Sequence, residues 1–356
     1  MYRTMIHEVF DEAERDCLSL KGIYDKLNSI HQLKARSEML DGIPELWTDW
    51  SDRVLQIERF MLYIEKLEVL PYMIDDGTRL NYEYIIRMMR LWNIWVSDFS
   101  SAFYYSPYVE QFYQTTISFP EAIESRCLPL TERSGEDIAR TVNNYITTLQ
   151  DAMRSRAFKE KIRHRDDHSR RMFISAIEYL DFLFNQHKRM VVLRMDFYLA
   201  ADAGIGLAGP LVPLLEYFGC LREDMKRRVG VFQHLTGYIA HVEYGYQKKH
   251  HIHAIFFFDG DKVRNDYALS QLIVQRWVEI TRGSGHYFNT QEKAGQYACP
   301  AIGMVHRDDR EKRQCLIYVI WYITKLDQFL PYKYSDKQRL FFRGELLSAL
   351  PRHCAE

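Results

Sequence analysis

The segments GYIAHVEYG at residues 237–245 and HIHAIFFFDG at residues 251–260 decide the fold, because they are two apolar strands separated by a short turn. Successive side chains of a strand point to opposite faces of a sheet, so His251 and His253 share a face. The two segments therefore predict an antiparallel hairpin with a histidine pair on one of its faces.

The turn at residues 246–249 folds the first strand back beside the second. The register that we expect brings Glu243, or His241 two residues earlier, onto the face that carries the two histidines. Two imidazoles and a carboxylate are a suitable ligand set for a divalent metal ion. The hairpin thus predicts a metal site, with Glu243 and His241 as alternative third ligands.

The pattern from residue 189 onward alternates strands with helices. We expect strands at 189–199, 237–245, 251–258, 286–290 and 301–306, and helices at 211–228, 266–280 and 309–329. The order β-α-β-β-α-β is that of a split βαβ, or ferredoxin-like, antiparallel sheet, here with an added strand and a C-terminal helix. The second half of the chain is therefore predicted to be an α+β domain.

The first half is helical by pattern. Residues 53–70 and 81–99 place apolar side chains at three- and four-residue spacing. The charged run at residues 154–171 is read as a linker, a DNA-contacting arm or, by preference, the solvated face of a helix. The domains expected are a helical accessory domain (1–164), an α+β domain (165–335) and a C-terminal tail (336–356).

The amino-acid composition predicts a folded protein in a reducing compartment. The 356 residues include 24 Tyr, 20 Phe and 6 Trp, and no apolar run approaches the length of a membrane span. The N-terminus has early acidic residues and no apolar leader segment. The six cysteines lack any Cys-x-x-Cys spacing, which favours free thiols over a zinc ribbon or a disulfide scaffold. We expect a soluble, cytoplasmic protein.

The formal net charge of −1 is the sum of an acidic first half and a basic second half. Residues 1–150 hold 15 Lys and Arg against 24 Asp and Glu, whereas residues 151–356 hold 32 against 24. A basic half joined to an acidic one suggests that the basic half binds a polyanion. Charge alone does not distinguish nucleic acid from an anionic membrane.

The predicted C-terminal helix carries Tyr318, Tyr322 and Lys325 on one stripe. A phenol becomes an adequate nucleophile when a metal polarises a phosphate and an ammonium group, here that of Lys325, lies nearby. The opposite arc of the helix is apolar, and we expect the helical N-terminal half to bury it. That arc consists of Leu316, Val319, Ile320 and Ile323.

The chain resembles the HUH endonucleases, the metal-dependent nucleases that start rolling-circle replication and conjugative transfer. His251-Ile252-His253 resembles their histidine pair, and Tyr318, Tyr322 and Lys325 resemble their tyrosine helix. Three segments are similar, more narrowly, to the replication initiators of filamentous phages (inovirus type) and related prophage proteins. These are RMVVLRMDFYL at 189–199, the histidine hairpin and YITKLDQ at 322–328.

This resemblance implies a site-specific nickase that cuts single-stranded or hairpin origin DNA. His251, His253 and Glu243 would bind Mg²⁺ or Mn²⁺, and Tyr322 would attack the scissile phosphate to leave a 5′-phosphotyrosine. Tyr318 would be a second nucleophile or only a neighbour. A host helicase and polymerase are the expected partners, and no membrane is expected. A transposase or a relaxase would use the same chemistry.

Several residues keep alternative interpretations. Lys248 and Lys249 at the hairpin tip would bind the DNA backbone or keep the turn soluble. Asp196 would approach the metal or end its strand. The segment from Gly204 to Gly209 fits the G-x-G-x-x-G pattern of dinucleotide-binding oxidoreductases. A non-catalytic DNA-binding regulator with the same fold is the other alternative function.

Overall fold

The computed structural model describes eleven stretches of the chain: residues 8–11, 19–29, 50–68, 96, 99, 105–119, 135–200, 211–245, 248–297, 299–325 and 339–345. The chain divides into two compact units. One consists of residues 1–30, 168–328 and 334–356, and the other of residues 31–167 and 329–333. The first thirty residues thus belong to the unit that contains the hairpin. The predicted domain boundary at residue 164 stays a prediction.

In the unit formed mainly by residues 31–167, the described secondary-structure elements are helices. It contains α3 (Trp50–Glu65), α6 (Pro107–Ser118), α8 (Gly135–Arg154) and the first turns of α9 (Arg156–Gln186). The Oγ of Ser106 accepts a hydrogen bond from the backbone N–H of Val109, and Pro107 begins α6 at a position that needs no N–H. The helix predicted at 81–99 lies almost wholly outside the described residues.

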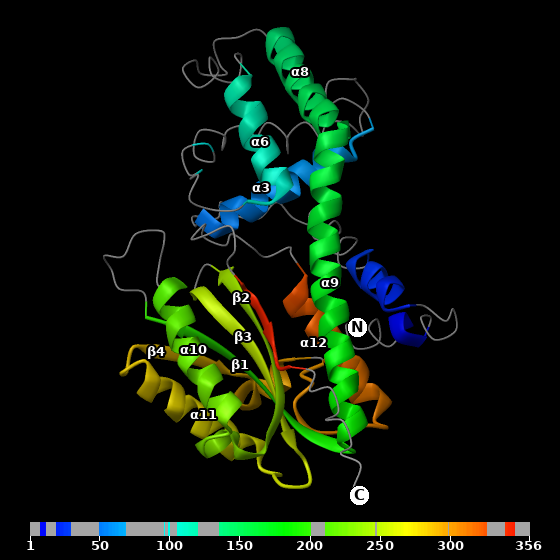
Figure 1. The fold of residues 1–356 in the computed structure, drawn as a ribbon. Helices are drawn as coiled ribbons and strands as arrows, with labels where there is room; N and C mark the ends of the chain where they lie inside the picture. The colour runs from blue at the N-terminus through cyan, green and yellow to red at the C-terminus, as the bar shows by residue number, and fades with distance from the viewer. Residues whose placement is uncertain are drawn as a thin grey trace, which may run out of the picture. The chain divides into compact units, whose positions relative to one another are not determined.

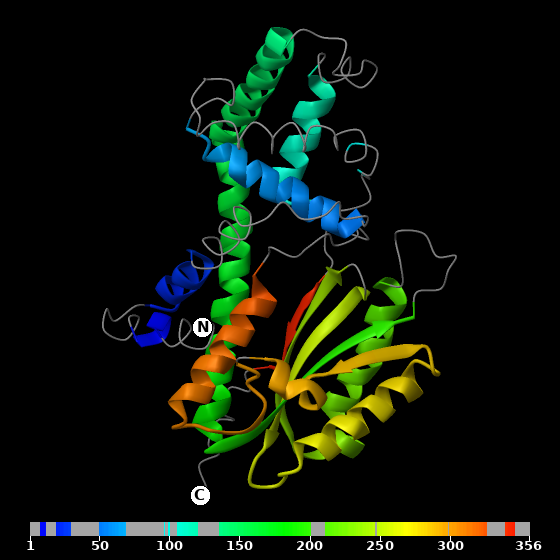
Figure 2. The same cartoon turned by 180° about the vertical axis from the view of Figure 1, so that it is seen from behind.

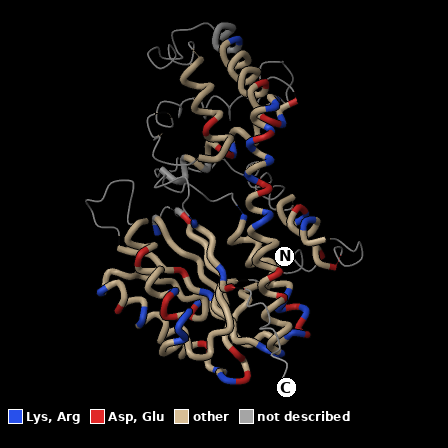
Figure 3. The backbone as a smooth tube through the Cα atoms, viewed as in Figure 1, with Lys and Arg blue, Asp and Glu red and all other residues tan. Residues whose placement is uncertain are grey.

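The charged run at residues 154–171 is helical and belongs largely to α9. Its charges pair along the helix and with neighbouring helices: Arg163 lies 3.2 Å from Glu160, and Arg165 lies 2.9 Å from Glu58. Figure 3 shows Lys and Arg interspersed with Asp and Glu along α9. Opposite charges three or four residues apart support a solvated helix. The preferred interpretation of this run as a helix face is therefore confirmed.

The other unit is built on one six-stranded antiparallel sheet (Figure 1). The strand order is β4-β1-β3-β2-β6, and β5 also pairs with β1. The strands are β1 (Arg189–Leu199), β2 (Leu235–Gly245), β3 (Lys249–Asp259), β4 (Gly285–Asn289), β5 (Gly303–His306) and β6 (Phe341–Arg343). The α+β prediction is confirmed. The short strand β6 was not predicted, and it comes from the segment assigned to the tail.

Helices cover both faces of this sheet, as Figures 1 and 2 show. On one face lie α10 (Leu211–Arg227) and α11 (Asp266–Ile280), and on the other lie α9 and α12 (Arg310–Thr324). The helix predicted at 309–329 is shorter than expected, because Lys325 adopts extended backbone and caps it. Two 3-10 helices complete the unit, η3 (Gly230–His234) and η4 (Thr290–Gln296).

The apolar arc of α12 is buried in the main core. That core joins α12 to α9, to the sheet and to the first residues of the chain. The expectation that the N-terminal half buries the arc is therefore met only in part, since Ile239 and Ile255 of the sheet also belong to the core. Its members from the N-terminal residues are Val9, Phe10, Tyr24 and Leu27.

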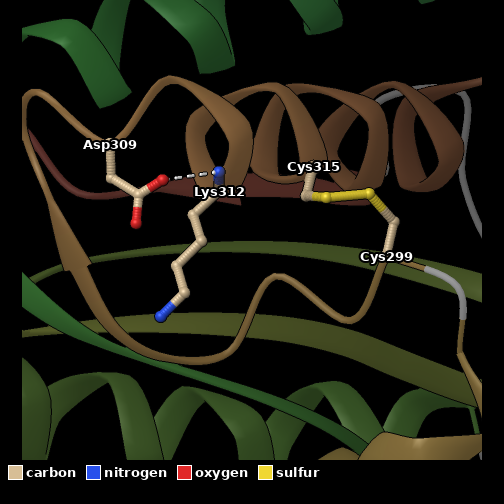
Figure 4. Close-up of a disulfide and its surroundings, with 4 residues drawn as sticks. All are labelled: Cys299, Asp309, Lys312 and Cys315. Carbon is tan, nitrogen blue, oxygen red and sulfur yellow. Dashed lines mark hydrogen bonds between the residues drawn. A yellow bond between two sulfur atoms is a disulfide. The ribbon is translucent and has the colours of Figure 1, made fainter. Parts of the chain in front are cut away.

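Two cysteines form a disulfide, which corrects the expectation of free thiols throughout. Cys299, just before β5, is bonded to Cys315 of α12, with 5.3 Å between their Cα atoms. Figure 4 shows the bond joining the loop to the helix, where Asp309 accepts a hydrogen bond from the backbone N–H of Lys312. Sequence spacing did not reveal the pair, because the turn into α12 brings the two residues together. Cys220, also described, is a free thiol.

Removal of this disulfide is expected to lower the free energy of unfolding by about 3 kcal/mol, since the bond closes a loop of about 15 residues in the unfolded chain. The double variant Cys299→Ser, Cys315→Ser would be compared with the wild type by urea unfolding without reductant. The control is Cys220→Ser, which removes the exposed free thiol. Equal stability of the double variant and the wild type would contradict this stabilisation.

Within the described residues, none of the helices combines the length and the apolar character that crossing a bilayer requires.

Candidate functional site

The strand register places the predicted metal ligands on one face of the sheet. Glu243 of β2 lies directly opposite His251 of β3, and His241 lies opposite His253. Directly opposed residues of an antiparallel pair project from the same face, with their Cβ atoms about 5 Å apart. The hairpin predicted from the sequence therefore collects these four side chains in two adjacent cross-strand pairs.

Three of the four side chains converge on one point. The Nε2 of His253 lies 2.8 Å from Oε2 of Glu243 and 3.1 Å from Nε2 of His251, and the third separation, from His251 to Glu243, is 3.8 Å. Their ligand atoms all lie within 4.8 Å of one another. Glu243, rather than His241, completes this group, which we call the metal cluster (Glu243, His251, His253).

The metal cluster fits a divalent cation. An ion with bonds of about 2.1 Å and octahedral geometry keeps adjacent ligand atoms about 3 Å apart, close to the separations found here. The Oε1 atom of Glu243 is buried and has no hydrogen-bond partner among the described residues. Buried carboxylate oxygens are normally satisfied, so an oxygen left without a donor suits a cation. Neither these distances nor this donor set selects one metal.

Asp196 of β1 orients His253 from the other side of the imidazole. Its Oδ1 lies 2.6 Å from Nδ1 of His253, and its Oδ2 accepts a hydrogen bond of 2.5 Å from Lys248. A carboxylate on one ring nitrogen fixes the tautomer and directs the other nitrogen toward the metal. Asp196 is thus a partner of a ligand, and Lys248, predicted to contact DNA, forms an ion pair with it.

In the metal cluster, opposite charges on neighbouring side chains offset the cost of burying each charged group. Burial opposes the charged form of His253, but the carboxylates of Asp196 and Glu243 outweigh it and raise the pKa of this imidazole to about 10. Burial acts likewise against the carboxylate of Glu243, yet the neighbouring His253 holds the pKa of Glu243 below its usual range. Burial lowers the pKa of His241 to about 4, which keeps this residue neutral. In the metal-free protein, a proton on His253 holds the cluster together.

Mn²⁺ binding is expected to strengthen about tenfold for each unit of pH between pH 6 and pH 8. His253 is protonated over this range in the metal-free protein, and its Nε2 must release the proton to bind an ion. Titration calorimetry at three pH values, in two buffers of different ionisation enthalpy, measures both the affinity and the number of protons released. An affinity that does not change with pH would contradict this arrangement.

The C-terminal end of α12 lies against the strand that carries Glu243, because His241 forms a hydrogen bond with the backbone of Ile323. The ammonium group of Lys325 lies 4.7 Å from the ring centre of Tyr322. Tyr322 also interacts electrostatically with the half-buried Arg194 of β1, as does Glu243. The charge of Arg194 therefore acts on both Tyr322 and Glu243.

Buried and partly buried hydrogen bonds fix this end of α12. The hydroxyl of Tyr24 donates to Ser169 of α9 over 2.6 Å, and Ser169 donates to the backbone carbonyl of Thr324. The indole N–H of Trp321 donates to Asn28 over 2.8 Å. Satisfied buried networks of this kind hold a segment in one arrangement. The position of Tyr322 is thus set by contacts on both of its sides along the chain.

The structure describes some of the other residues predicted for the site and not the rest. Tyr318 and Tyr322 both pack against the main core, and the ring of Tyr318 lies 5.4 Å from that of Trp321. The side chain of Lys249 and the glycine segment 204–209 lie outside the described part of the chain. Sequence reasoning missed Arg194, although the two-residue period of β1 places it on the face of Asp196.

Comparison with known proteins gives one match. A family model described as the YagK/YfjJ C-terminal domain matches residues 151–343, which include α9, the whole sheet and α12. Neither a curated protein nor a solved structure matches the chain. The matched region covers more than half of the 356 residues and contains the metal cluster. The chain therefore belongs to the YagK/YfjJ C-terminal domain family, a family of prophage-associated proteins.

Proposed function

We propose that this protein is a metal-dependent DNA nickase with a tyrosine nucleophile, which initiates rolling-circle replication of a phage or prophage element. The observation that carries the proposal is the proximity of the metal cluster to the end of the helix that bears Tyr322. A cation site beside a phenol and an ammonium group suits phosphodiester transesterification. The prophage association of the family agrees with a role in mobile DNA.

The fold supports the same proposal. The strand order β4-β1-β3-β2, with antiparallel neighbours throughout, is compatible with the split βαβ sheet that the resemblance to the HUH nucleases implies. A dinucleotide-binding unit instead requires parallel strands joined by a crossover helix. The strand that precedes the glycine segment, β1, has only antiparallel neighbours among the described strands. This weakens the oxidoreductase alternative.

In the proposed reaction, Mg²⁺ or Mn²⁺ held by Glu243, His251 and His253 would polarise the scissile phosphate. The phenolic oxygen of Tyr322 attacks the phosphorus, and the bond from phosphorus to the 3′-oxygen breaks. The tyrosine loses its proton, the leaving 3′-oxygen gains one, and the 5′-phosphate remains on the protein. Lys325, whose ammonium lies over the Tyr322 ring, stabilises the negative charge that develops on the phenolic oxygen.

The test is covalent capture of DNA by the full chain. Single-stranded oligonucleotides, with and without hairpins, are incubated with Mn²⁺ and separated on denaturing gels. A 5′-phosphotyrosine predicts that a 3′ label stays with the protein, whereas a 5′-labelled product is released with a 3′-OH that a polymerase can extend. No adduct on any substrate would reject the nickase and leave the DNA-binding regulator. A 5′ label retained on the protein would reject the proposed polarity.

A further inference from the structure

Two rows of side chains run across the sheet from the metal cluster to the edge strand β4. In one row, Phe288 lies opposite Asp196, which lies opposite His253. In the other, His286 lies opposite Tyr198, which lies opposite His251. Opposed residues share a face, so the rings on β4 lie on the face of the metal cluster, about 10 Å away across two strand spacings.

The rings at this edge are combined with positive charges. The rings of Tyr198 and His286 are stacked, with 5.7 Å between their centres and 19° between their planes. The ammonium groups of Lys248 and Lys293 lie 4.5 Å and 5.0 Å from the ring centre of Phe288. We call Tyr198, His286, Phe288 and Lys293 the β4 platform.

A further aromatic ring lies near the sheet beside Arg194 of β1. Tyr297, which follows η4, is 37% exposed, and the guanidinium of Arg194 lies 5.5 Å from its ring centre. Arg194 in turn interacts with Tyr322. His286 and Lys293 are exposed as well. Aromatic and basic side chains thus form an accessible strip beside the metal cluster.

This combination suits single-stranded DNA. Unpaired bases stack on aromatic rings, and lysines bind the phosphates between them, whereas a duplex conceals the faces of its bases. On the opposite face of the sheet, α11 covers β1 and β4 (Figure 1). The strip also begins where the scissile phosphate would lie in the proposed reaction, so the same strand could contact both.

We propose that the β4 platform binds the single-stranded DNA that flanks the scissile phosphate, with Phe288 as its central stacking residue. This inference rests on the proposed function for the position of the phosphate, but the binding itself requires neither metal nor cleavage.

The experiment measures binding of fluorescent single-stranded DNA to the full chain by anisotropy in EDTA. Phe288→Leu removes the ring but keeps an apolar side chain, and we expect the Kd to rise about 5- to 100-fold. The matched control is Tyr267→Leu, which removes a 54% exposed ring from α11 on the other face and should leave the Kd unchanged. Phe288→Tyr keeps a ring and should retain the wild-type affinity, which shows that the loss comes from stacking.

The charges of the platform are tested by salt dependence. Lys293→Ala is expected to reduce the slope of log K against log salt concentration by about 0.7, because one phosphate contact to a single strand is lost. Lys262→Ala removes an exposed lysine beyond β3 and should leave the slope unchanged.

Three outcomes would overturn the proposal: an unchanged Kd in Phe288→Leu, an equal loss in Tyr267→Leu, or tighter binding of RNA than of DNA. Failure of the proposed nickase function gives a different result from failure of the β4 platform. The covalent adduct would be absent, while Phe288→Leu would still weaken the binding of DNA. Conversely, an adduct formed by a protein whose Kd is insensitive to Phe288 would reject the platform alone.

Discussion

The variant Tyr322→Phe is expected to lose the covalent adduct with DNA, with a rate reduced on the order of 1,000-fold or more, because the attacking oxygen is removed. Tyr322 is better placed than Tyr318, since Ile323 contacts His241 beside the metal cluster. Tyr318 lies about 6 Å further back along the helix axis. The measurement is a time course of adduct formation with a 3′-labelled oligonucleotide and Mn²⁺.

Tyr318→Phe is the matched control, since it removes the same hydroxyl from the same helix and should keep the wild-type rate. Both variants should bind DNA in EDTA as the wild type does. If the adduct is lost in Tyr318→Phe and kept in Tyr322→Phe, the assignment of the two tyrosines is reversed. An adduct that forms in the double variant would place the nucleophile outside α12.

His253→Ala is expected to weaken Mn²⁺ binding by more than about 100-fold. Loss of a residue that only orients a ligand typically costs about 10- to 100-fold in metal affinity, and loss of the ligand itself costs more. His253 has the largest expected effect because it contacts both Glu243 and His251 in the metal cluster. Titration calorimetry with Mn²⁺ gives the affinity, and adduct formation should fall with it.

Three further variants make the result interpretable. Glu243→Gln keeps the side-chain volume and should also weaken Mn²⁺ binding strongly, even if His253→Ala unfolds because it leaves buried carboxylates unpaired. Asp196→Asn should have the smaller effect of an orienting residue. His306→Ala, an exposed imidazole at the end of β5, should bind Mn²⁺ as the wild type does. Wild-type affinity in both Glu243→Gln and His253→Ala would exclude the metal cluster.

Much of the sheet could be predicted because its signals are local. The strand at 189–199 and the helix at 266–280 have the predicted bounds in the structure. In the helix, Asn265 accepts a hydrogen bond from the N–H of Ala268 and marks the start. The metal cluster could be predicted for the same reason, since one tight hairpin determines which residues of β2 and β3 face each other.

The missed features depend on contacts between distant parts of the chain. The approach of Asp196 to the metal site was one of two alternatives, and it was left open because the register of β1 on β3, across an intervening helix and strand, is not contained in local patterns. The disulfide depends on the path of the chain between β5 and α12. The strand β6 has three residues, too few for a two-residue period to be recognised.

The contacts between residues 8–29 and α12 have a consequence for synthesis. The bond between Asn28 and Trp321 joins residues 293 positions apart. At the usual rates of translation, the N-terminal partner waits on the order of 15–60 s for the other. During that time Val9, Phe10 and Leu27, which are buried in the finished core, have no final partners from α12. The apolar side chains of these residues would therefore stay without their α12 partners until that helix is made, and Tyr322 would reach its place only after that.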